Sequence, residues 1–447
     1  MAAKLRIHLG AVQSLNYGVP KLRIFLGAVQ VLWADEIYWG CDFTMASSFE
    51  VDLTVGSPPY PPVVGRWTWA VTERLIFHTE ILQSHNRTEQ RIAKRRGVPE
   101  HRLSARLWIE GEWNSARLDA VLHTWLKRTW RVPVWSDAEA HRGPLAAAST
   151  VIPIDTRYSD FSTSFARRNC LIWQNAGTYE FGQIDAKTDS SLTLQAGLSN
   201  SYTGHKWVVP VRIGRLIDAA LLERTHDGGL IAMTFRIEDV EAMAGFTAVM
   251  TYDDYTVLTD PAVLVGDSGR FSHAPDIAIL DAGTGPFEIV SNSDFNEVTQ
   301  SHGWRPWTKA ACWWLRQLLY DIKGRQQAFL VPTFKQDIEL TRPVAANATT
   351  LYCRNSDLIQ MGANAMRTYV AFRPAGSDII VRKVTDISLV SAAEELITID
   401  ASPEQAFAAA EHLCWVDKCR LASDEIELTW SGIGKLSTDT PLIRVTN

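Results

Sequence analysis

The sequence lacks the residue patterns that usually reveal an enzyme or a metal site. It contains no Gly-x-Ser-x-Gly motif, no Walker-type phosphate loop and no His-Glu-x-x-His. Its six cysteines are scattered, and only Cys414 and Cys419 are close neighbours, whereas a zinc site needs two close pairs or a pair with spaced histidines. We therefore expect no catalytic residue, metal or cofactor, and we expect the cysteines to be reduced and buried.

Long apolar runs and a strong charge of one sign are also missing. No stretch approaches the ~18 uninterrupted apolar residues of a membrane-spanning helix, and the first residues lack the apolar run of a signal peptide. The formal net charge of −6 gives no overall attraction to nucleic acid. With 46% hydrophobic and 21% charged residues, the chain is expected to be globular, without a membrane span.

Tryptophan, by contrast, is abundant, with 17 residues beside 11 tyrosines. Large rigid aromatic side chains bury much area at a small cost in conformational entropy, so they suit β cores and permanent interfaces. We expect aromatic packing anchors at six positions, namely Trp125, Trp135, Trp207, Trp314, Phe334 and Trp415.

A short repeat opens the chain. The segment from Lys4 to Gln13 returns almost unchanged from Lys21 to Gln30, and each copy alternates apolar and polar residues before a glycine. Tyr17-Gly18-Val19-Pro20 supplies a turn between the copies. The pattern predicts an N-terminal β arm or small β-roll over residues 1–45, which is too small to be stable alone.

A longer repeat predicts two related β-rich units, at 46–240 and 301–447, joined by connecting strands and loops at 241–300. Each unit has a helical pattern, at 118–126 and 313–320, followed by a Val-Pro strand. Further matches align Thr150-Val151-Ile152 with Thr350-Leu351-Tyr352, and Trp207-Val208 with Trp415-Val416. The order of one helix and several short strands predicts an α+β fold dominated by antiparallel sheets, produced by internal duplication.

Two adjacent acids deserve weighing as a candidate site. Asp253 and Asp254 could serve acid–base chemistry or calcium binding. Adjacent residues on a strand point to opposite faces, however, so the two carboxylates would not converge. A solvated turn is the favoured interpretation.

A basic run comprises Arg87, Arg91, Lys94, Arg95, Arg96 and Arg102. Such a cluster could contact phosphates, but no aromatic residue lies between 78 and 107 to stack on bases. Glu89 and Glu100 are interleaved with the bases. We therefore favour a subunit contact or a solvated strand face, and a neighbouring acidic ring is a further possible partner.

Several segments carry a resemblance to a known class of protein. The stretches Phe77–Ser84 and Arg87–Ala93 look like a segment of phage tail proteins encoded near the tape measure. The later runs Val-Pro-Val-Trp (132–135), Val-Ile-Pro-Ile-Asp (151–155) and Val-Val-Pro-Val-Arg (208–212) look similar as well. The chain thus resembles tail-tip or baseplate proteins of long-tailed bacteriophages, of the distal-tail or hub type.

The resemblance implies a structural virion protein, located in the tail tip and assembled in the host cytoplasm. Its implied work is to form a ring or hub that joins the tail tube to distal components. Implied partners are further copies of the chain, as a trimer or hexamer, with tail tube, tape-measure and hub or fibre proteins, and no specific nucleic acid. Two related units in each chain would let a trimer match a hexameric tube.

Two other functions stay open. Tryptophans gathered at 304, 307, 313 and 314 could form a carbohydrate- or receptor-binding surface on a tail module, although core and interface packing is favoured. A tail-associated cell-wall hydrolase would need converging carboxylates or a Cys–His pair, for which the sequence gives little support.

Overall fold

The chain forms antiparallel sheets with little helix. This computed structural model describes residues 4–5, 15–16, 21–25, 29–33, 51–52, 65–84, 89–94, 98–110, 129–175, 178–218, 221–225, 228–241, 250–259, 270–275, 277–281, 287–291, 296–362, 367–373, 378–409 and 412–445, with single residues in some gaps. Among the named strands of these ranges, only β5 with β10 pairs in parallel. The predicted α+β fold with mostly antiparallel sheets is therefore confirmed.

The N-terminal arm is a four-stranded sheet in which each strand pairs with the next. Its alternating residues favour strands, and the strands pair only with one another among the described residues. They are β1 (Lys4–Leu5), β2 (Leu15–Asn16), β3 (Lys21–Phe25) and β4 (Val29–Trp33).

We call residues 65–237 the first sheet unit. Strand β9 pairs with β6 on one side and with β18 on the other, while β18 also pairs with β17 and with the end of β16. Hairpin β7–β8 connects β6 to β9, and β16 pairs along β10. The strands are β6 (Gly65–Ile76), β7 (Thr79–Gln83), β8 (Glu89–Ala93), β9 (Glu100–Glu110), β10 (Thr129–Pro133), β16 (Lys206–Leu216), β17 (Leu221–Thr225) and β18 (Gly228–Ile237). Strand β5 (Val51–Asp52), which precedes the unit in the sequence, pairs with β10.

A small β lobe lies between β10 and β16 and has its own apolar core, which includes Ile152, Ile172 and Tyr202. In this lobe β13 pairs with β14 and β16, and β15 pairs with β12 and β14. Its elements are the 3₁₀ turn η3 (Trp135–Asp137), β11 (Glu139–His141), β12 (Val151–Ile152), β13 (Asn169–Asn175), β14 (Thr178–Thr188) and β15 (Ser191–Leu194).

We call residues 270–445 the second sheet unit. Strand β24 pairs with β21 on one side and with β32 on the other, while β32 also pairs with β31 and with the end of β30. Hairpin β22–β23 connects β21 to β24, and β30 pairs along β25. The elements are β21 (Arg270–Ala274), β22 (Ile277–Leu280), β23 (Glu288–Ser291), β24 (Glu297–Trp304), α2 (Lys309–Ile322), β25 (Phe329–Pro332), β30 (His412–Leu421), β31 (Glu425–Gly432) and β32 (Lys435–Arg444).

A second lobe lies between β25 and β30, with a separate core that includes Leu351, Phe372 and Trp415. Here β27 pairs with β28 and β30, and β29 pairs with β26 and β28. Its strands are β26 (Thr350–Arg354), β27 (Tyr369–Arg373), β28 (Ile380–Ser391) and β29 (Glu394–Ile399).

The two units therefore repeat one order of strand pairing. Even an irregularity recurs, because β14 and β28 each shift register against the following strand, between Ile184 and Ala186 and between Val384 and Asp386. The residues described between 112 and 123 are helical. They lie between β9 and β10, as α2 lies between β24 and β25 in the second unit. Descent of the units from a duplicated sequence stays a prediction, since a shared pairing order is a match of architecture.

The register of the strands corrects two of the predicted residue matches. Ile152 pairs with Leu192 and Leu351 with Ile397, so Ile152 corresponds to Leu351 and the predicted match is one residue out. Similarly, Val211 and Val416 each lie opposite the proline of the Val-Pro strand, so Trp207 does not correspond to Trp415. Burial agrees with the first correction, because Ile152 and Leu351 are buried whereas Val151 and Thr350 are exposed, and a slip of one residue exchanges the core face of a strand for its outer face.

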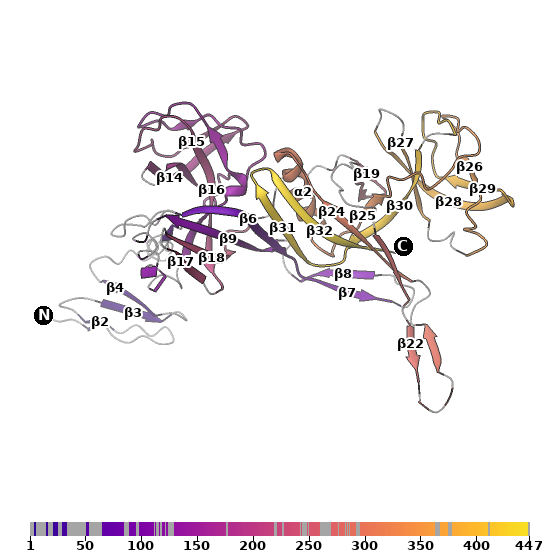
Figure 1. Cartoon of the computed structure of the whole chain (residues 1–447), viewed down its shortest axis with the longest axis horizontal. Coiled ribbons are helices and arrows are strands. Elements are labelled where there is room, and N and C mark those ends of the chain that lie inside the picture. Colours follow the sequence, from indigo (N-terminus) through magenta and orange to yellow (C-terminus); the bar gives the residue numbers. More distant parts are fainter. Residues whose placement is uncertain are drawn as a thin grey trace.

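The two units meet in one continuous sheet with a shared core. Strand β31 of the second unit pairs with β6 of the first over six residue pairs, from Glu425↔Ile76 to Trp430↔Val71. The largest apolar cluster contains buried residues from both units and from α2. Figure 1 shows β6, β31 and β32 crossing the middle of the molecule between the two lobes.

Helix α2 covers this shared core. Thr308 caps it by accepting a hydrogen bond from the Ala311 amide, and the chain leaves it through Lys323 in the left-handed conformation. Its apolar face is buried against the sheet and includes Cys312, Leu315 and Leu319. In the described part of the chain, no helix has the length and apolar character needed to cross a membrane.

The segment predicted as a connector, 241–300, contains the short pair β19 (Thr251–Tyr252) and β20 (Tyr255–Thr256). It also contains β21 and the first half of β24, which pair within the second sheet unit. The domain boundaries at 45, 240 and 300 stay predictions, because the pairings show only which strands share a sheet.

Candidate functional site

A network of deeply buried charges lies where the two units meet. Arg316 of α2 binds Glu73 of β6 at 3.1 Å (Nη2 to Oε1) and Asp137 of η3 at 2.9 Å (Nη1 to Oδ2). The Trp430 indole N–H donates to Glu73 Oε2 at 3.0 Å, and His101 Nε2 lies 3.1 Å from Glu73 Oε1. All five side chains are almost completely buried.

Burial and charge compete in this cluster. Burial alone would raise the pKa of Glu73, but Arg316, His101 and Trp430 together outweigh it and lower that pKa to about 2. Burial is also the largest influence on Asp137, and it raises the pKa of that carboxyl in spite of Arg316. Shifted carboxyl pKa values of this kind often mark active sites, so the surrounding space decides the interpretation.

That space is too small for a substrate. The gap among Asp137, Tyr158, Arg316 and Trp430 measures about 10 Å³, at the lower limit for one water molecule. A typical small-molecule site measures several hundred Å³. The cluster therefore fits a structural role, in which Arg316 ties α2, β6 and η3 together.

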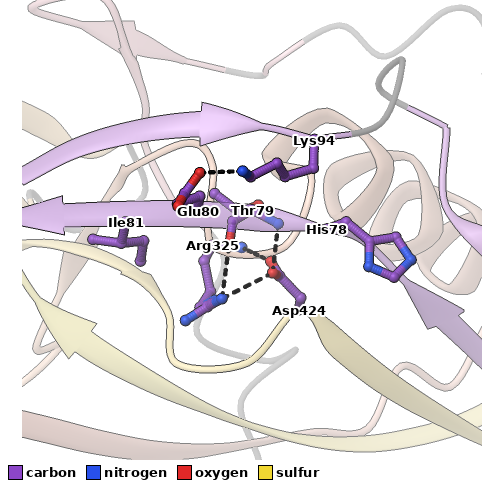
Figure 2. A pocket seen from close by; sticks show the side chains of 7 residues that line it. All are labelled: His78, Thr79, Glu80, Ile81, Lys94, Arg325 and Asp424. Atoms are coloured by element: carbon purple, nitrogen blue, oxygen red, sulfur yellow. Dashed lines mark hydrogen bonds and ion pairs between the residues drawn. The ribbon is translucent and has the colours of Figure 1, made fainter.

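A second polar cluster lies in an open cleft of about 720 Å³ at the base of hairpin β7–β8. Asp424 of the second unit accepts hydrogen bonds from the backbone amides of Thr79 at 2.8 Å and Arg325 at 2.9 Å, and Arg325 donates to the Thr79 carbonyl at 2.8 Å (Figure 2). Lys94 pairs with Glu80 within the hairpin. These polar groups bind one another, so they attach the hairpin of the first unit to the second unit.

Two further contacts hold this hairpin. Glu89 at the start of β8 accepts two hydrogen bonds from Arg420 of β30, each of 2.8 Å, and both side chains are nearly buried. Just before β7, Phe77 packs edge-on against Tyr320 of α2, with ring centroids 6.4 Å apart. A bidentate arginine–carboxylate pair fixes orientation as well as distance.

The predicted basic cluster lies partly on this hairpin. Arg91, Lys94 and Arg102 each have an acidic neighbour, respectively Glu89 at 3.8 Å, Glu80, and Glu100 at 2.8 Å. Arg87, Arg95 and Arg96 lie outside the described residues. Pairing of the described bases with acids favours a protein contact over phosphate binding.

The predicted aromatic anchors lie in or beside the apolar cores. Trp415 is buried in the core of the second lobe. Trp135, Trp207, Trp314 and Phe334 are half-buried and pack against core clusters. Trp125 falls outside the described residues.

The three most deeply buried tryptophans of the described residues are Trp130, Trp304 and Trp430, and none of them is among the predicted anchors. For Trp430 a signal was present, since residues 425–430 alternate polar and apolar side chains and end on this residue. Glu73 and Arg316 were also missed. Their meeting depends on the pairing of β31 with β6, which no local pattern reveals.

The tryptophans at 304–314 do not make one aromatic surface. Trp304 is buried and donates its N–H to Thr440 at 2.5 Å. Trp313 and Trp314 are half-buried on α2, and Trp307 alone of the four is exposed, at 73%. The grouping in sequence therefore mostly reflects packing.

Other sequence candidates have simple places in the fold. Asp253 and Asp254 form the tip of the β19–β20 turn, with φ of 49° and 64°, and Asp253 accepts from the Tyr369 hydroxyl at 2.7 Å. The five cysteines that the structure describes are free and buried, while Cys41 lies outside it. Within the described ranges, no three His, Cys, Asp or Glu side chains gather as metal ligands.

The more informative surface is the pair of open strand edges at the ends of the continuous sheet. From end to end its strands run β17, β18, β9, β6, β31, β32, β24, β21. Among the described residues, β17 is in register only with β18 and β21 only with β24, so the outer edge of each is open. An open edge presents unpaired backbone N–H and C=O groups and is a template for pairing with another chain.

Beside the β21 edge, hairpin β22–β23 projects from the body of the molecule (Figure 1). Its exposed large apolar side chains are Ile277, Ile279, Leu280, Phe287, Ile289 and Val290. Apolar residues gathered in this way are typical of a surface that is covered by a partner. The arrangement can bind a protein through both backbone pairing and apolar burial.

Comparison with known proteins assigns no family. No protein-family model matches the chain, and no curated protein matches it. The function must therefore be argued from the geometry and from the resemblance of short segments.

Proposed function

We propose that this chain is a structural assembly protein of a phage tail tip or baseplate, which forms a ring or hub joining the tail tube to distal tail components. The observation that carries the assembly role is the continuous sheet with an open edge at each end, beside which the apolar hairpin β22–β23 projects. The buried charges between the units give the chain a rigid middle rather than a reaction site.

The position of the open edges supports a ring. The open edges belong to different strands at opposite ends of the sheet, so contact between copies joins unlike surfaces. Such a contact produces a closed ring when the rotation between copies closes, and an open filament otherwise. The tail location rests on the resemblance of residues 77–93, 132–135 and 208–212 to tail proteins.

The test is the mass of the purified full-length chain in solution, measured by light scattering on a sizing column from about 1 to 100 µM. We expect one discrete oligomer, a trimer or hexamer, that appears as a ring by negative-stain electron microscopy. A single monomeric mass across this range contradicts self-assembly. In that case glycan-binding and peptidoglycan-hydrolysis screens test the receptor-binding and hydrolase alternatives directly.

A further inference from the structure

The chain already contains one junction between sheet units, and its parts are well defined. Strand β31 of the second unit pairs edge to edge with β6 of the first. Hairpin β7–β8, which follows β6, then binds to the second unit through Glu89 with Arg420, and through Thr79 with Asp424. The junction thus has a strand-pairing part and a hairpin-docking part.

Each part of that junction has a counterpart at one of the two ends of the continuous sheet, where no other described strand pairs with it. By the pairing order, β17 corresponds to β31. In the first unit β17 pairs with the long strand β18 that follows it, and in the second unit β31 pairs in the same way with β32. Likewise β21 corresponds to β6. Strand β21 pairs with β24, which follows hairpin β22–β23, and β6 pairs with β9, which follows hairpin β7–β8. Hairpin β22–β23 corresponds to β7–β8 by the same order.

The charged pair of the hairpin also has a counterpart. Arg420 pairs in the sheet with Ile443, and Arg215 holds the same place opposite Arg236 in the first unit. Glu89 opens the return strand of one hairpin and Glu288 opens that of the other. Glu288 is exposed, and the Arg215 side chain is 56% exposed, where it contacts Glu238 at 2.9 Å.

A groove lies where the second hairpin would dock. It measures about 710 Å³ and is lined at one side by Arg215, Leu216 and Ile217, where β16 ends. In the second unit the equivalent end of β30 carries Arg420, which the chain's own hairpin β7–β8 contacts. Ile217 is an exposed apolar side chain in this groove. Docking of an apolar hairpin here would bury Ile217 and the hairpin's apolar side chains against each other.

We propose that a second copy of this chain binds head to tail, with β21 and hairpin β22–β23 of one copy docking on β17 and the β16 end of its neighbour. This contact copies the junction inside the chain and rests on the proposed function in assembly. The sheet then continues from copy to copy, and the outward apolar residues of the hairpin become buried.

The internal junction also fixes the register between copies. Leu428 lies opposite Glu73 inside the chain, and the counterparts of these two residues are Leu222 and Phe271. Phe271 is 43% exposed and Leu222 is half-buried against the core, so pairing them covers apolar surface on both strands.

A cysteine cross-link tests this register in the full-length chain. The double variant Leu222→Cys/Phe271→Cys should form disulfides between copies under mild oxidation, seen as a ladder on a non-reducing gel. Residues directly opposite in an antiparallel pair lie ~4.5–5.5 Å apart, within disulfide reach. The matched control Leu222→Cys/Ala274→Cys is three residues, or about 10 Å, out of register and should not cross-link.

A charge exchange tests the hairpin part. Arg215→Glu and Glu288→Arg should each weaken self-association by at least about ten-fold, and the double variant should regain most of it. Both side chains are exposed, so circular dichroism and urea midpoints should match those of the original chain.

The outcomes separate this interface from the proposed function. A discrete oligomer with in-register cross-links and charge rescue supports both. A discrete oligomer in which neither the cross-link nor the rescue appears overturns the interface and leaves the assembly role standing. A chain that stays monomeric and forms no cross-link at ~100 µM overturns both.

Discussion

The two hairpins of this chain have the same place in the strand order but opposite surroundings. Hairpin β7–β8 is held by Arg420, Asp424 and Arg325 of the second unit. Hairpin β22–β23 projects and exposes six large apolar side chains. The contacts of the docked hairpin β7–β8 therefore indicate what kind of surface the exposed hairpin β22–β23 binds.

The two junctions nevertheless differ in chemistry. Inside the chain, Glu73 lies opposite Leu428 and is buried with Arg316, an arrangement that requires an uninterrupted network of partners. The counterpart of Glu73 at the open end is Phe271. An apolar edge contains no charge that would be left without its ion-pair partner in the free monomer. It therefore suits a contact that forms between separate molecules.

The largest expected effect comes from breaking the internal junction at Arg316. Arg316→Met leaves Glu73 and Asp137 buried without their cation, and the free energy of unfolding should fall by about 3–5 kcal/mol. The urea midpoint measures this. Arg354→Met removes an exposed pair with Glu339 and should change stability by about 1 kcal/mol or less. Equal shifts in the two variants would contradict a structural role for the buried network.

Acid should weaken the internal junction in a defined pH window. The pKa of Glu73 is lowered from 4.5 to about 2 in the folded chain, so its stabilising contribution is present above pH 4.5 and is lost as the pH falls toward 2. The contribution is on the order of 3 kcal/mol. Urea midpoints between pH 2 and 6 measure it. In Glu73→Gln this part of the pH dependence should disappear, and its persistence would contradict the assignment to Glu73.

A smaller effect should distinguish the two hairpins directly. Ile279 on β22 and Leu82 on β7 each lie one residue pair before the last pair of their hairpin, and they are 61% and 52% exposed. Ile279→Asp should weaken self-association by about ten-fold or more, because it places a charge in the buried contact between copies. Leu82→Asp is the matched control and should leave the oligomer mass unchanged. Light scattering measures both, and equal effects would contradict the assigned contact.

Much of the fold could be predicted because it depends on local patterns. Alternating residues predicted β3, and apolar spacing predicted α2, since each period reflects the geometry of its own element. The matched order of elements pointed to two similar units. Register was harder, and the match of Ile152 was one residue out, because register depends on the partner strand.

The surfaces that matter most for function could not be predicted in this way. Glu73 and Arg316 are 243 positions apart, and only the pairing of β31 with β6 brings them together. In the described part of the chain, β17 and β21 each pair along one edge only. A sequence pattern predicts a strand but does not predict which of its edges stays open. The basic run, in contrast, was visible, and its described members pair with nearby acids.

The most direct test is amide hydrogen exchange of the full-length chain, compared between dilute monomer and concentrated oligomer. If the contact between copies repeats the internal junction, the amides of β17 and β21 should become protected in the oligomer, while those of β31 and β6 stay equally protected in both samples. An oligomer in which residues 221–225 and 270–274 exchange as fast as in the monomer would contradict the shared geometry of the two junctions.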